Sequence, residues 1–335
     1  MKTELSVACL GGTFFSPALQ DLGFRVLPLP LSRPEILDWA EVCHRAGEAP
    51  DLLLYLDRSL PPPLVGLERF PCLTAFWCID SHIHSWYPAW AQGFDLCFAS
   101  LKDHLPRFGL RLPPERAHWL PPFADLGHRP PATPPDKEWD LLFAGTVNPQ
   151  TTPGRAAFLD ELARRFPGLA VRQGRFSELF PRARLALNVA ERNDLNFRVF
   201  EALACGACLL TPRVGHGQDE LFRHGEHLFV YDPEDMDGLV RLVQDLLADP
   251  ARCAAVAAAG KAAVEAAHRP VHRARQVARV VAGLDARDVV EKRLEQAKEI
   301  RETYLKLVYL HWAEAAQDPA ARAAYLAAAA GLAGR

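Results

Sequence analysis

The segment from Asn193 to Gly206 brings a cation and a carboxylate onto one face of a predicted helix. Asn193 or Asp194 can cap the start of this helix, and the glycine can end it. A helix start offers free N–H groups and partial positive charge, and Arg198 adds a forked cation suited to diphosphate oxygens. Glu201 lies three residues further on, where its carboxylate could accept hydrogen bonds from sugar hydroxyls. The spacing indicates half of a nucleoside diphosphate site, or else an intrahelical ion pair worth about 0.3 kcal/mol.

Two further segments could complete this site. Gly145 ends a predicted strand, and the Thr-Thr-Pro run after it looks like a capped helix start, so the chain from Gly145 to Arg155 could pass beneath the diphosphate. Arg155 is a second candidate cation, with a solvated first-turn side chain as the alternative. Gly215 and His216 follow a later strand, where they could face the transferred sugar or form a surface turn.

A carboxylate and two imidazoles follow a predicted strand in the first half of the chain. Asp80, His82 and His84 come directly after the apolar run Leu73–Ile79. A carboxylate or imidazole there could orient or deprotonate an acceptor hydroxyl, and a structural or substrate-positioning role is the alternative. His82 and His84 could also ligate a metal, because alternate residues of an extended segment point the same way. No third and fourth ligands have suitable spacing, so we predict no metal and no cofactor.

Other motifs argue against competing chemistry. Cys205 and Cys208 form a C-x-x-C pair, which can indicate redox chemistry or half of a zinc site. The pair stands at a helix end and has no second pair, so tight packing by small residues is the better interpretation. The sequence contains no P-loop, G-x-G-x-x-G or G-x-S-x-G motif, which removes the usual signals of kinases, dehydrogenases and hydrolases.

The elements that must position these residues follow an α/β pattern. Short apolar runs alternate with longer segments of helical period, which predicts βαβ units around parallel sheets. The predicted strands are Leu5–Leu10, Phe24–Leu29, Leu52–Leu56, Leu73–Ile79 and Leu96–Ala99, then Asp140–Ala144, Leu169–Arg172, Leu185–Val189, Ala207–Thr211 and Leu228–Tyr231. Helices are predicted at about 154–166, 195–205, 235–248 and 251–267.

The domain boundary is predicted in a Pro-rich run. We expect an N-terminal domain over residues 1–125, a linker over 126–139, a nucleotide-binding domain over 140–284 and a helical tail over 285–335. The tail could pack on the body, form a homodimer or bind a partner protein. It has heptad-like apolar positions at Val290, Leu294, Ile300, Leu305 and Leu307, and Asp318 with Pro319 predicts the start of a last helix.

Length and charge limit the class of protein. A chain of 335 residues exceeds the usual size of one hydrophobic core, so two domains are expected. Its net charge of -3 argues against attraction to nucleic acid or to an anionic membrane. We expect a cytoplasmic protein without a membrane span, because no apolar run approaches about 18 residues and the first residues lack the core of a signal peptide. Eight scattered cysteines indicate reduced thiols.

The block Asn196–Ala207 resembles the donor-site segment of GT-B glycosyltransferases, especially the CgeB-like, spore-maturation-type and family 1-like group. The resemblance continues through Glu220–Phe222 and Gly225–Glu226 to helices that end near residue 268. It is weaker at Phe98–Lys102 and His118–Pro122, and it covers most of residues 50–280. It implies two Rossmann-like domains whose parallel sheets face a cleft. The activity implied is that of a hexosyltransferase-like enzyme, which moves sugar from a nucleotide sugar to a glycan, protein or small-molecule acceptor without a metal.

The resemblance also implies roles for single residues. Glu201 matches the second Glu of a Glu-x7-Glu motif, and this Glu holds the donor ribose. Asn196 and Arg198 belong to the same donor-binding block. Asn193 stands where the first Glu of the motif would fall, and Glu191 is two residues too early, so the stereochemical outcome stays open. A GT-B-fold sugar-nucleotide epimerase or hydrolase, and a non-catalytic nucleotide-sugar-binding scaffold, remain alternatives.

Overall fold

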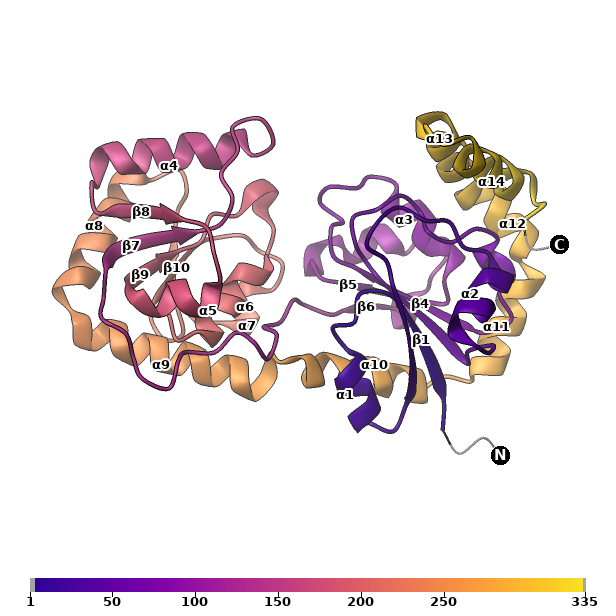
Figure 1. Cartoon of the computed structure of the whole chain (residues 1–335), viewed down its shortest axis with the longest axis horizontal. Coiled ribbons are helices and arrows are strands. Elements are labelled where there is room, and N and C mark those ends of the chain that lie inside the picture. Colours follow the sequence, from indigo (N-terminus) through magenta and orange to yellow (C-terminus); the bar gives the residue numbers. More distant parts are fainter. Residues whose placement is uncertain (1–3, 334–335) are drawn as a thin grey trace. The chain divides into compact units, whose positions relative to one another are not determined.

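The computed structural model describes residues 4–333 and divides the chain into two compact units. The first unit combines Met1–Pro121 with Arg273–Arg335, and the second unit is Pro122–His272. Each unit is an α/β fold with one parallel sheet (Figure 1). The chain therefore leaves the first unit once, builds the second, and returns.

The first unit contains a six-stranded parallel sheet in the order β2-β1-β3-β4-β5-β6. Its four central strands are buried and almost continuously apolar, as expected where helices and loops cover both faces, whereas the two edge strands are only partly buried. They are β1 (Ser6–Gly11), β2 (Arg25–Pro30), β3 (Leu52–Leu56), β4 (Leu73–Cys78), β5 (Leu96–Ala99) and β6 (Ala117–Trp119). All five predicted strands are confirmed. The sixth was missed because three half-buried edge residues leave no recognisable pattern.

The helices of the first unit come from both ends of the chain. They are α1 (Ser16–Asp21), α2 (Trp39–Ala46), α3 (Tyr87–Trp90), most of α10 (Pro270–Ala282), α11 (Ala286–Glu295), α12 (Ala297–Ile300), α13 (Lys306–Ala315) and α14 (Pro319–Ala330). A π-helical turn, Arg301–Leu305, joins α12 to α13. Asp318 caps α14 as predicted, because its carboxylate accepts the N–H groups of Ala320 and Ala321.

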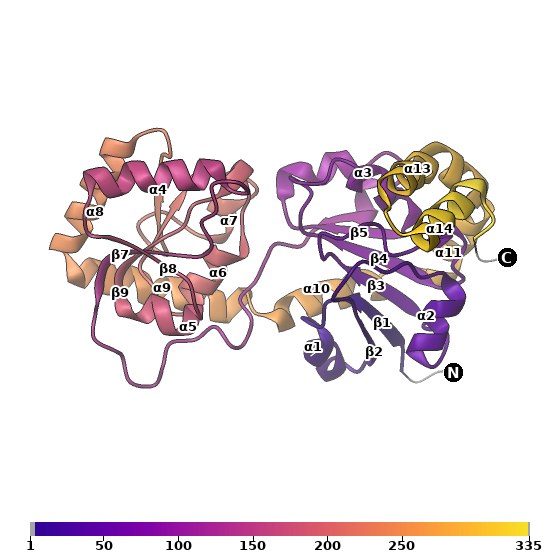
Figure 2. The ribbon, with the colours of Figure 1, turned by 45° about the horizontal axis from the view of Figure 1, so that its top comes forward.

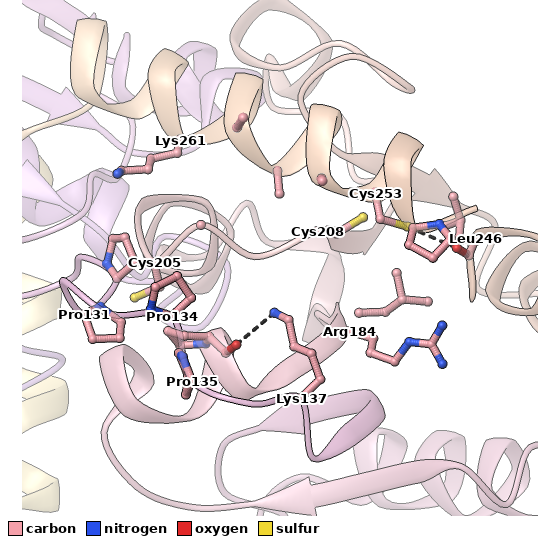
Figure 3. A pocket seen from close by; sticks show the side chains of 18 of the residues that line it. Pro131, Pro134, Pro135, Lys137, Arg184, Cys205, Cys208, Leu246, Cys253 and Lys261 are labelled. Atoms are coloured by element: carbon pink, nitrogen blue, oxygen red, sulfur yellow. Dashed lines mark hydrogen bonds between the residues drawn. The ribbon is translucent and has the colours of Figure 1, made fainter. Parts of the chain in front are cut away.

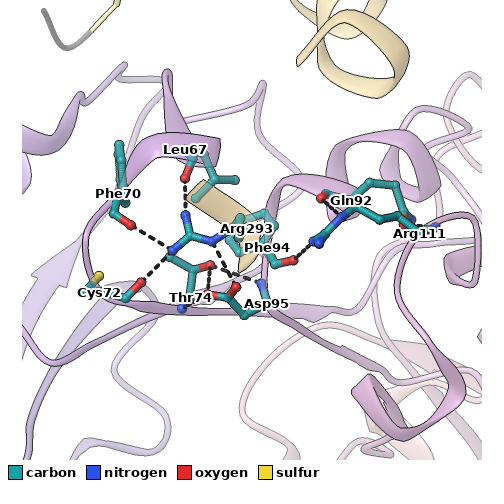
Figure 4. Close-up of polar contacts among 9 residues, drawn as sticks. All are labelled: Leu67, Phe70, Cys72, Thr74, Gln92, Phe94, Asp95, Arg111 and Arg293. Carbon is teal, nitrogen blue, oxygen red and sulfur yellow. Dashed lines mark hydrogen bonds and ion pairs between the residues drawn. The ribbon is translucent and has the colours of Figure 1, made fainter. Parts of the chain in front are cut away.

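A fully buried arginine attaches the C-terminal helices to the first unit (Figure 4). Arg293, on α11, donates to Asp95 Oδ1 at 2.9 Å and to the carbonyl oxygens of Leu67, Phe70 and Cys72, each at 2.7 Å. Packing on the body, one of the roles predicted for the tail, is therefore confirmed. A homodimer or a partner contact through the tail stays a prediction.

The predicted apolar stripe of the tail is only partly correct. Ile300 and Leu305 are buried, but Leu294 is 37% exposed and Leu307 is 74% exposed. Arg293 takes the inward position on α11 in place of Leu294. The π turn then adds a residue to the helix, so the inward face resumes at Val308 rather than Leu307.

The second unit contains a five-stranded parallel sheet in the order β11-β10-β9-β7-β8. Helices α4 and α8 lie on one side of this sheet, and α6 and α9 lie on the other (Figure 1, Figure 2). The strands are β7 (Trp139–Ala144), β8 (Leu169–Arg172), β9 (Ala183–Leu187), β10 (Leu209–Pro212) and β11 (Phe229–Tyr231). The helices are α4 (Pro153–Arg165), α5 (Phe176–Leu179), α6 (Phe197–Ala204), α7 (Gln218–Leu221), α8 (Met236–Ala248) and α9 (Pro250–Ala267).

The structure divides the chain at other places than the predicted ranges. Residues 122–139 belong to the second unit, because the N–H of Ala124 donates to His268 at 3.0 Å and that of Glu138 donates to Arg182 at 2.8 Å. Residues 273–335 belong to the first unit, because Arg293 in this segment bonds to Asp95 of that unit. The predicted boundaries at 125, 139 and 284 therefore do not coincide with those of the compact units.

The strand order reverses once in each sheet. The loops that follow the two strands at such a reversal can form a ligand site. In the first unit the reversal lies between β1 and β3, and in the second it lies between β7 and β9. Loops leaving the carboxyl ends of two such strands run to opposite faces of the sheet and leave a crevice between them. Residues just after β3 and β7 are therefore well placed to contact a ligand.

Candidate functional site

Helix α6 begins later than predicted but still presents Arg198 in its first turn. Its N-cap residue is Asn196, in an extended conformation and without a side-chain capping bond. The predicted cap at Asn193 or Asp194 is wrong, because Asn193 ends a separate short turn with a φ of 57°. Gly206 ends the helix as predicted, with a φ of 75°.

Arg198 is held by aromatic faces and an amide rather than by a carboxylate. Its guanidinium lies 5.1 Å from the ring centre of Phe143 and 5.7 Å from that of Phe176. Nη1 donates to Asn188 Oδ1 at 3.4 Å, and the buried Nε finds no hydrogen-bond partner among the described residues. Burial lowers the pKa of Arg198, and the nearby charge of Arg155 lowers it further. A cation in this setting is suited to bind an anion.

Gly145 follows β7 and lies directly against Arg198. Its φ is 152°, and a Cβ at this position would stand 2.6 Å from Arg198 Nη2 and 3.3 Å from the ring of Phe143. Only glycine therefore leaves the guanidinium where it is. The structure brings together two of the residues that the sequence predicted for the site.

Arg155, in the first turn of α4, shares the same aromatic ring. Its guanidinium lies 5.7 Å from the centre of Phe143, and Nη1 donates to the carbonyl of Thr146 at 3.0 Å. Glu191 accepts the N–H of Arg155 at 3.2 Å and lies 3.9 Å from its Nε. The side chain of Arg155 is 15% exposed, so it is not the solvated residue considered as an alternative. Two guanidinium groups thus lie near one aromatic ring, and the Glu191 carboxylate lies beside that of Arg155.

Glu201 is a partly buried carboxylate without an ion pair to Arg198. Its side chain is 17% exposed, and its nearest ionisable partner is His128 Nε2 at 3.8 Å. Burial raises the pKa of Glu201 to about 7, against the opposing charge of Arg198. No hydrogen bond to this carboxylate forms within the part of the chain that the structure describes. The intrahelical ion pair considered from the sequence is therefore not formed.

The remaining predicted donor residues lie around this centre. Asn193 is exposed, whereas the Oδ1 atom of Asn196 is buried without a partner among residues 4–333. Gly215 and His216 follow β10 with φ values of 57° and 54°. His216 is only 8% exposed, and Gln218 pins its loop by bonds to the N–H of Val214 and the carbonyl of Pro212. Side-chain hydrogen bonds therefore fix the conformation of this loop, which differs from the flexible surface turn considered as an alternative.

A pocket of about 350 Å³ adjoins Arg155 at the carboxyl edge of the sheet. It lies between the start of α4 and the ends of β9, β10 and β11, with Glu191, Phe158 and Tyr231 in its wall. The rings of Phe158 and Tyr231 stack at 6.0 Å, and the Tyr231 hydroxyl donates to the carbonyl of Asn188 at 2.8 Å. The pocket therefore offers a partly aromatic space beside Arg155.

In the first unit, the structure joins two of the three predicted catalytic residues. Ser59 Oγ donates to Asp80 Oδ2 and lies 2.9 Å from His84 Nε2. Ser59 has a φ of 53°, an unusual conformation for a residue other than glycine. His82 lies between Asp80 and His84 on the same turn and is half-buried.

A buried carboxylate, Asp57, holds the backbone of Ser59 and Asp80 in place. Asp57, directly after β3, is 3% exposed and accepts the N–H groups of Ser59 and Asp80 at 2.8 and 3.0 Å. The Tyr87 hydroxyl donates to it at 2.5 Å. Burial raises the pKa of Asp57, and the neighbouring charge of Asp80 raises it further. Sequence reasoning missed Asp57, although its place after a predicted strand matches that of Asp80.

A larger pocket of about 440 Å³ lies at the other edge of the second sheet (Figure 3). Arg184 near the start of β9 and Cys208 just before β10 line it, so it opens at the amino ends of the strands. Six prolines form much of its wall: Pro130, Pro131, Pro134, Pro135, Pro181 and Pro250. It lies away from Arg198 and Glu201, which stand at the carboxyl edge.

Cys205 and Cys208 are free, buried thiols, as are most of the eight cysteines. Burial raises the pKa of the Cys205 thiol to about 12 and that of Cys208 further, so neither is a thiolate at neutral pH. Packing by small residues is therefore the role that the structure supports. Within residues 4–333, no three His, Cys, Asp or Glu side chains gather as metal ligands. None of the described helices has the length and apolar character needed to cross a membrane.

Comparisons with known proteins agree with this architecture. A family model for glycosyl transferase-like proteins matches residues 155–279, which run from α4 into α10. No curated protein matches the sequence. HepE of Anabaena, solved with UDP and glucose, has a TM-score of 0.61 at 12% identity over 84% of this chain and 100% of its own.

Other solved structures align over a similar length. Sucrose-phosphate synthase from Thermosynechococcus elongatus has a TM-score of 0.57 at 12% identity, over 83% of this chain and 98% of its own. An α-glucosyltransferase solved with UDP-glucose and DNA containing an abasic site has a TM-score of 0.54 at 10% identity, over 83% of this chain and 100% of its own. The chain has the GT-B fold, and its residues 155–279 match the glycosyl transferase-like family model.

Proposed function

We propose that this protein transfers a sugar from a nucleotide-diphosphate sugar, held by its second unit, to an acceptor hydroxyl. The observation that carries this proposal is the pair Arg198 and Arg155 near the ring of Phe143, beside a glycine whose missing side chain leaves room for the Arg198 guanidinium. The pair stands at the point where strand order reverses, the usual ligand crevice of such sheets. The glycosyl transferase-like match of residues 155–279 supports the same class of reaction.

The donor site would divide into a phosphate end and a ribose end. Arg198, Arg155 and the start of α6 would neutralise the diphosphate as the bond to the sugar breaks. Glu201 would accept ribose hydroxyls, which its lack of internal hydrogen bonds supports. HepE was solved with UDP, and the α-glucosyltransferase with UDP-glucose. Uridine nucleotides are therefore the first probes for this chain, and CgeB-like enzymes are the group that we propose for it.

The acceptor would be activated by the cluster around Asp80. In the reaction, the bond from the sugar C1 to the diphosphate oxygen breaks, and a bond from C1 to the acceptor oxygen forms. The acceptor proton would pass to the Asp80 carboxylate, which Ser59 and His84 orient. Asp57 would hold this turn in place without touching the substrate. No metal enters this scheme, and the protein is proposed to act in the cytoplasm.

A thermal-shift screen tests the proposal, because a ligand that binds only the folded state raises its melting temperature. UDP, GDP, ADP, CDP and TDP would be compared, and one of them should give the largest increase. If none of the five raises the melting temperature, the donor site is wrong. The matching nucleotide sugar would then be supplied without acceptor. Full turnover in that assay would favour an epimerase or hydrolase, and binding with no turnover on any acceptor would favour a scaffold.

A further inference from the structure

A turn at the start of the second unit is fixed by one buried arginine. Arg269 is 4% exposed, and its Nη1 donates to the carbonyl of Asp125 at 2.7 Å. Its Nη2 donates to the carbonyl of His128 at 3.0 Å, and Glu265 pairs with the same guanidinium. The N–H of His128 closes the turn by donating to Asp125 at 3.0 Å. The backbone of His128 is therefore held in place although it lies outside the sheet and its helices.

This turn presents the imidazole of His128 to Glu201. His128 Nε2 lies 3.8 Å from Glu201 Oε1, which is too long for a hydrogen bond. A hydroxyl oxygen can stand about 2.8 Å from both atoms at once, because that needs a separation of no more than about 5.6 Å. The other ring nitrogen, Nδ1, is buried and has no partner among the described residues.

Burial favours a neutral His128 ring. It lowers the pKa of His128 against the opposing charge of Asp125, and the charge of Arg269 adds a smaller lowering. A neutral imidazole carries one N–H donor and one acceptor nitrogen, so it can bind a hydroxyl in either sense. Together with the Glu201 carboxylate, it offers a hydroxyl both an acceptor and a second partner.

Phe176 links this pair to the phosphate end of the site. Its partly exposed ring lies 6.2 Å from the His128 ring and 5.7 Å from the Arg198 guanidinium. His128, Glu201, Phe176 and Arg198 therefore surround one region of the second unit, with the cation at one end and the imidazole at the other. A ligand whose phosphate meets Arg198 would present its adjoining sugar to Glu201 and His128.

We propose that His128 is a ribose-recognition residue, which shares a ribose hydroxyl with Glu201 and so selects ribonucleoside over deoxyribonucleoside diphosphates. This inference rests on the proposed donor site, because it assigns a further contact within it. It adds a specificity determinant that comes from the Pro-rich run at the start of the second unit and not from the glycosyl transferase-like segment at 155–279.

The test is calorimetry with UDP, 2′-deoxy-UDP and 3′-deoxy-UDP, or the matching set for the base that the thermal-shift screen selects. His128→Ala should weaken UDP binding about 3- to 10-fold, the range of one neutral hydrogen bond. For the analogue that lacks the shared hydroxyl, the same change should alter affinity by less than about twofold. His311→Ala is the matched control, because His311 is exposed on α13 of the first unit and should leave binding unchanged.

A double-mutant cycle separates recognition from general damage. If His128 and Glu201 share one hydroxyl, the losses of His128→Ala and Glu201→Gln should not add in the double variant. Equal losses for all three ligands, or no loss, would overturn the inference and leave the donor site standing. Failure of the wild type to bind any nucleoside diphosphate would overturn the proposed function and this inference with it. Should His128→Ala not fold, His128→Gln is measured by the same criterion.

Discussion

Arg198 can be tested separately from the stability of the helix that carries it. Arg198→Ala should weaken nucleoside diphosphate binding by about 10- to 150-fold, because charge-assisted hydrogen bonds are worth roughly 1.5 to 3 kcal/mol. The affinity of Arg198→Lys should lie between those of the wild type and Arg198→Ala, since lysine keeps the positive charge but loses the forked set of donors. Calorimetry measures both, with Arg164→Ala, exposed in the last turn of α4, as control. Unchanged affinity in Arg198→Ala would remove this residue from the site.

Glu201 should make donor binding depend on pH. Burial raises its pKa to about 7, so the free protein carries a proton there at pH 6 that must leave before the carboxylate accepts two ribose hydroxyls. Affinity for a nucleotide sugar should therefore rise between pH 6 and pH 8, and this rise should be absent in Glu201→Gln. Titration calorimetry at both pH values measures the difference. An equal rise in the variant would mean that another group is responsible.

The same shift predicts an opposite effect on stability. A folded-state pKa above the unfolded value contributes stability at low pH that is lost as pH rises through about 7. Glu201→Gln should therefore raise the free energy of unfolding at pH 8 by up to about 3 kcal/mol, and raise the melting temperature with it. At pH 5 the substitution should change both quantities little. A Glu201→Gln variant that binds the nucleotide less tightly but unfolds at a higher temperature would show that Glu201 serves ligand binding at a cost in stability. Lower stability at both pH values would return Glu201 to a structural role.

Asp80 should affect turnover rather than donor affinity. Asp80→Asn keeps the acceptance of a hydrogen bond from Ser59 but cannot take up a proton. Turnover should fall about 100-fold or more, with nucleotide affinity nearly unchanged, because general-base catalysis contributes on this scale. Steady-state kinetics and calorimetry on the same preparation measure the two effects. Unchanged turnover would transfer the role to His84 or His82.

At the scale of elements, strand order explains why distant residues meet. Gly145 follows β7, Asn188 follows β9, and these two strands are neighbours at the reversal of the second sheet. The sequence predicts Gly145, Arg198 and Glu201, because each stands beside a recognisable strand or helix. It does not predict Asn188 or Phe176 as contacts of Arg198, since their proximity depends on the order of strands in the sheet.

Gly145 gives this geometry a direct test. Gly145→Ala should displace the Arg198 guanidinium, because the new Cβ would stand 2.6 Å from Nη2 in a backbone conformation that alanine rarely adopts. Nucleotide affinity should therefore fall nearly as far as in Arg198→Ala, measured by calorimetry. Gly225→Ala is the control, since its φ is also positive and nothing lies within 4 Å of its Cβ. It should lose stability without losing affinity.

At the scale of the whole molecule, the helical ending is the part that sequence reasoning divided differently. The apolar pattern of residues 285–335 is typical of a separate helical tail. The residue that attaches these helices to the first unit is charged, so it does not contribute to that pattern. Arg293 looks like a solvent-facing side chain in sequence, yet it is fully buried against Asp95 and three carbonyl oxygens. A pattern of apolar residues cannot reveal a buried ion pair whose partners lie about 200 residues apart.

Removing this arginine should destabilise the first unit. Arg293→Ala would leave the Asp95 carboxylate buried without its counter-ion, which costs about 3 to 5 kcal/mol. Thermal unfolding should begin at a lower temperature, while nucleotide binding by the second unit should persist below that transition. Arg287→Ala on the same helix is exposed and should have little effect. Coincident loss of stability and nucleotide affinity would mean that the two units depend on each other.

The return of the chain to its first unit also sets an order of assembly during synthesis. A ribosome completes residues 122–272 before it reaches Arg293, so the second unit has all its strands while the first still lacks its last helices. Until then, the Asp95 carboxylate lacks the Arg293 guanidinium that pairs with it in the finished fold. The domain begun first is thus the one finished last, and the nascent chain must keep its opening half protected from aggregation while the inserted half folds.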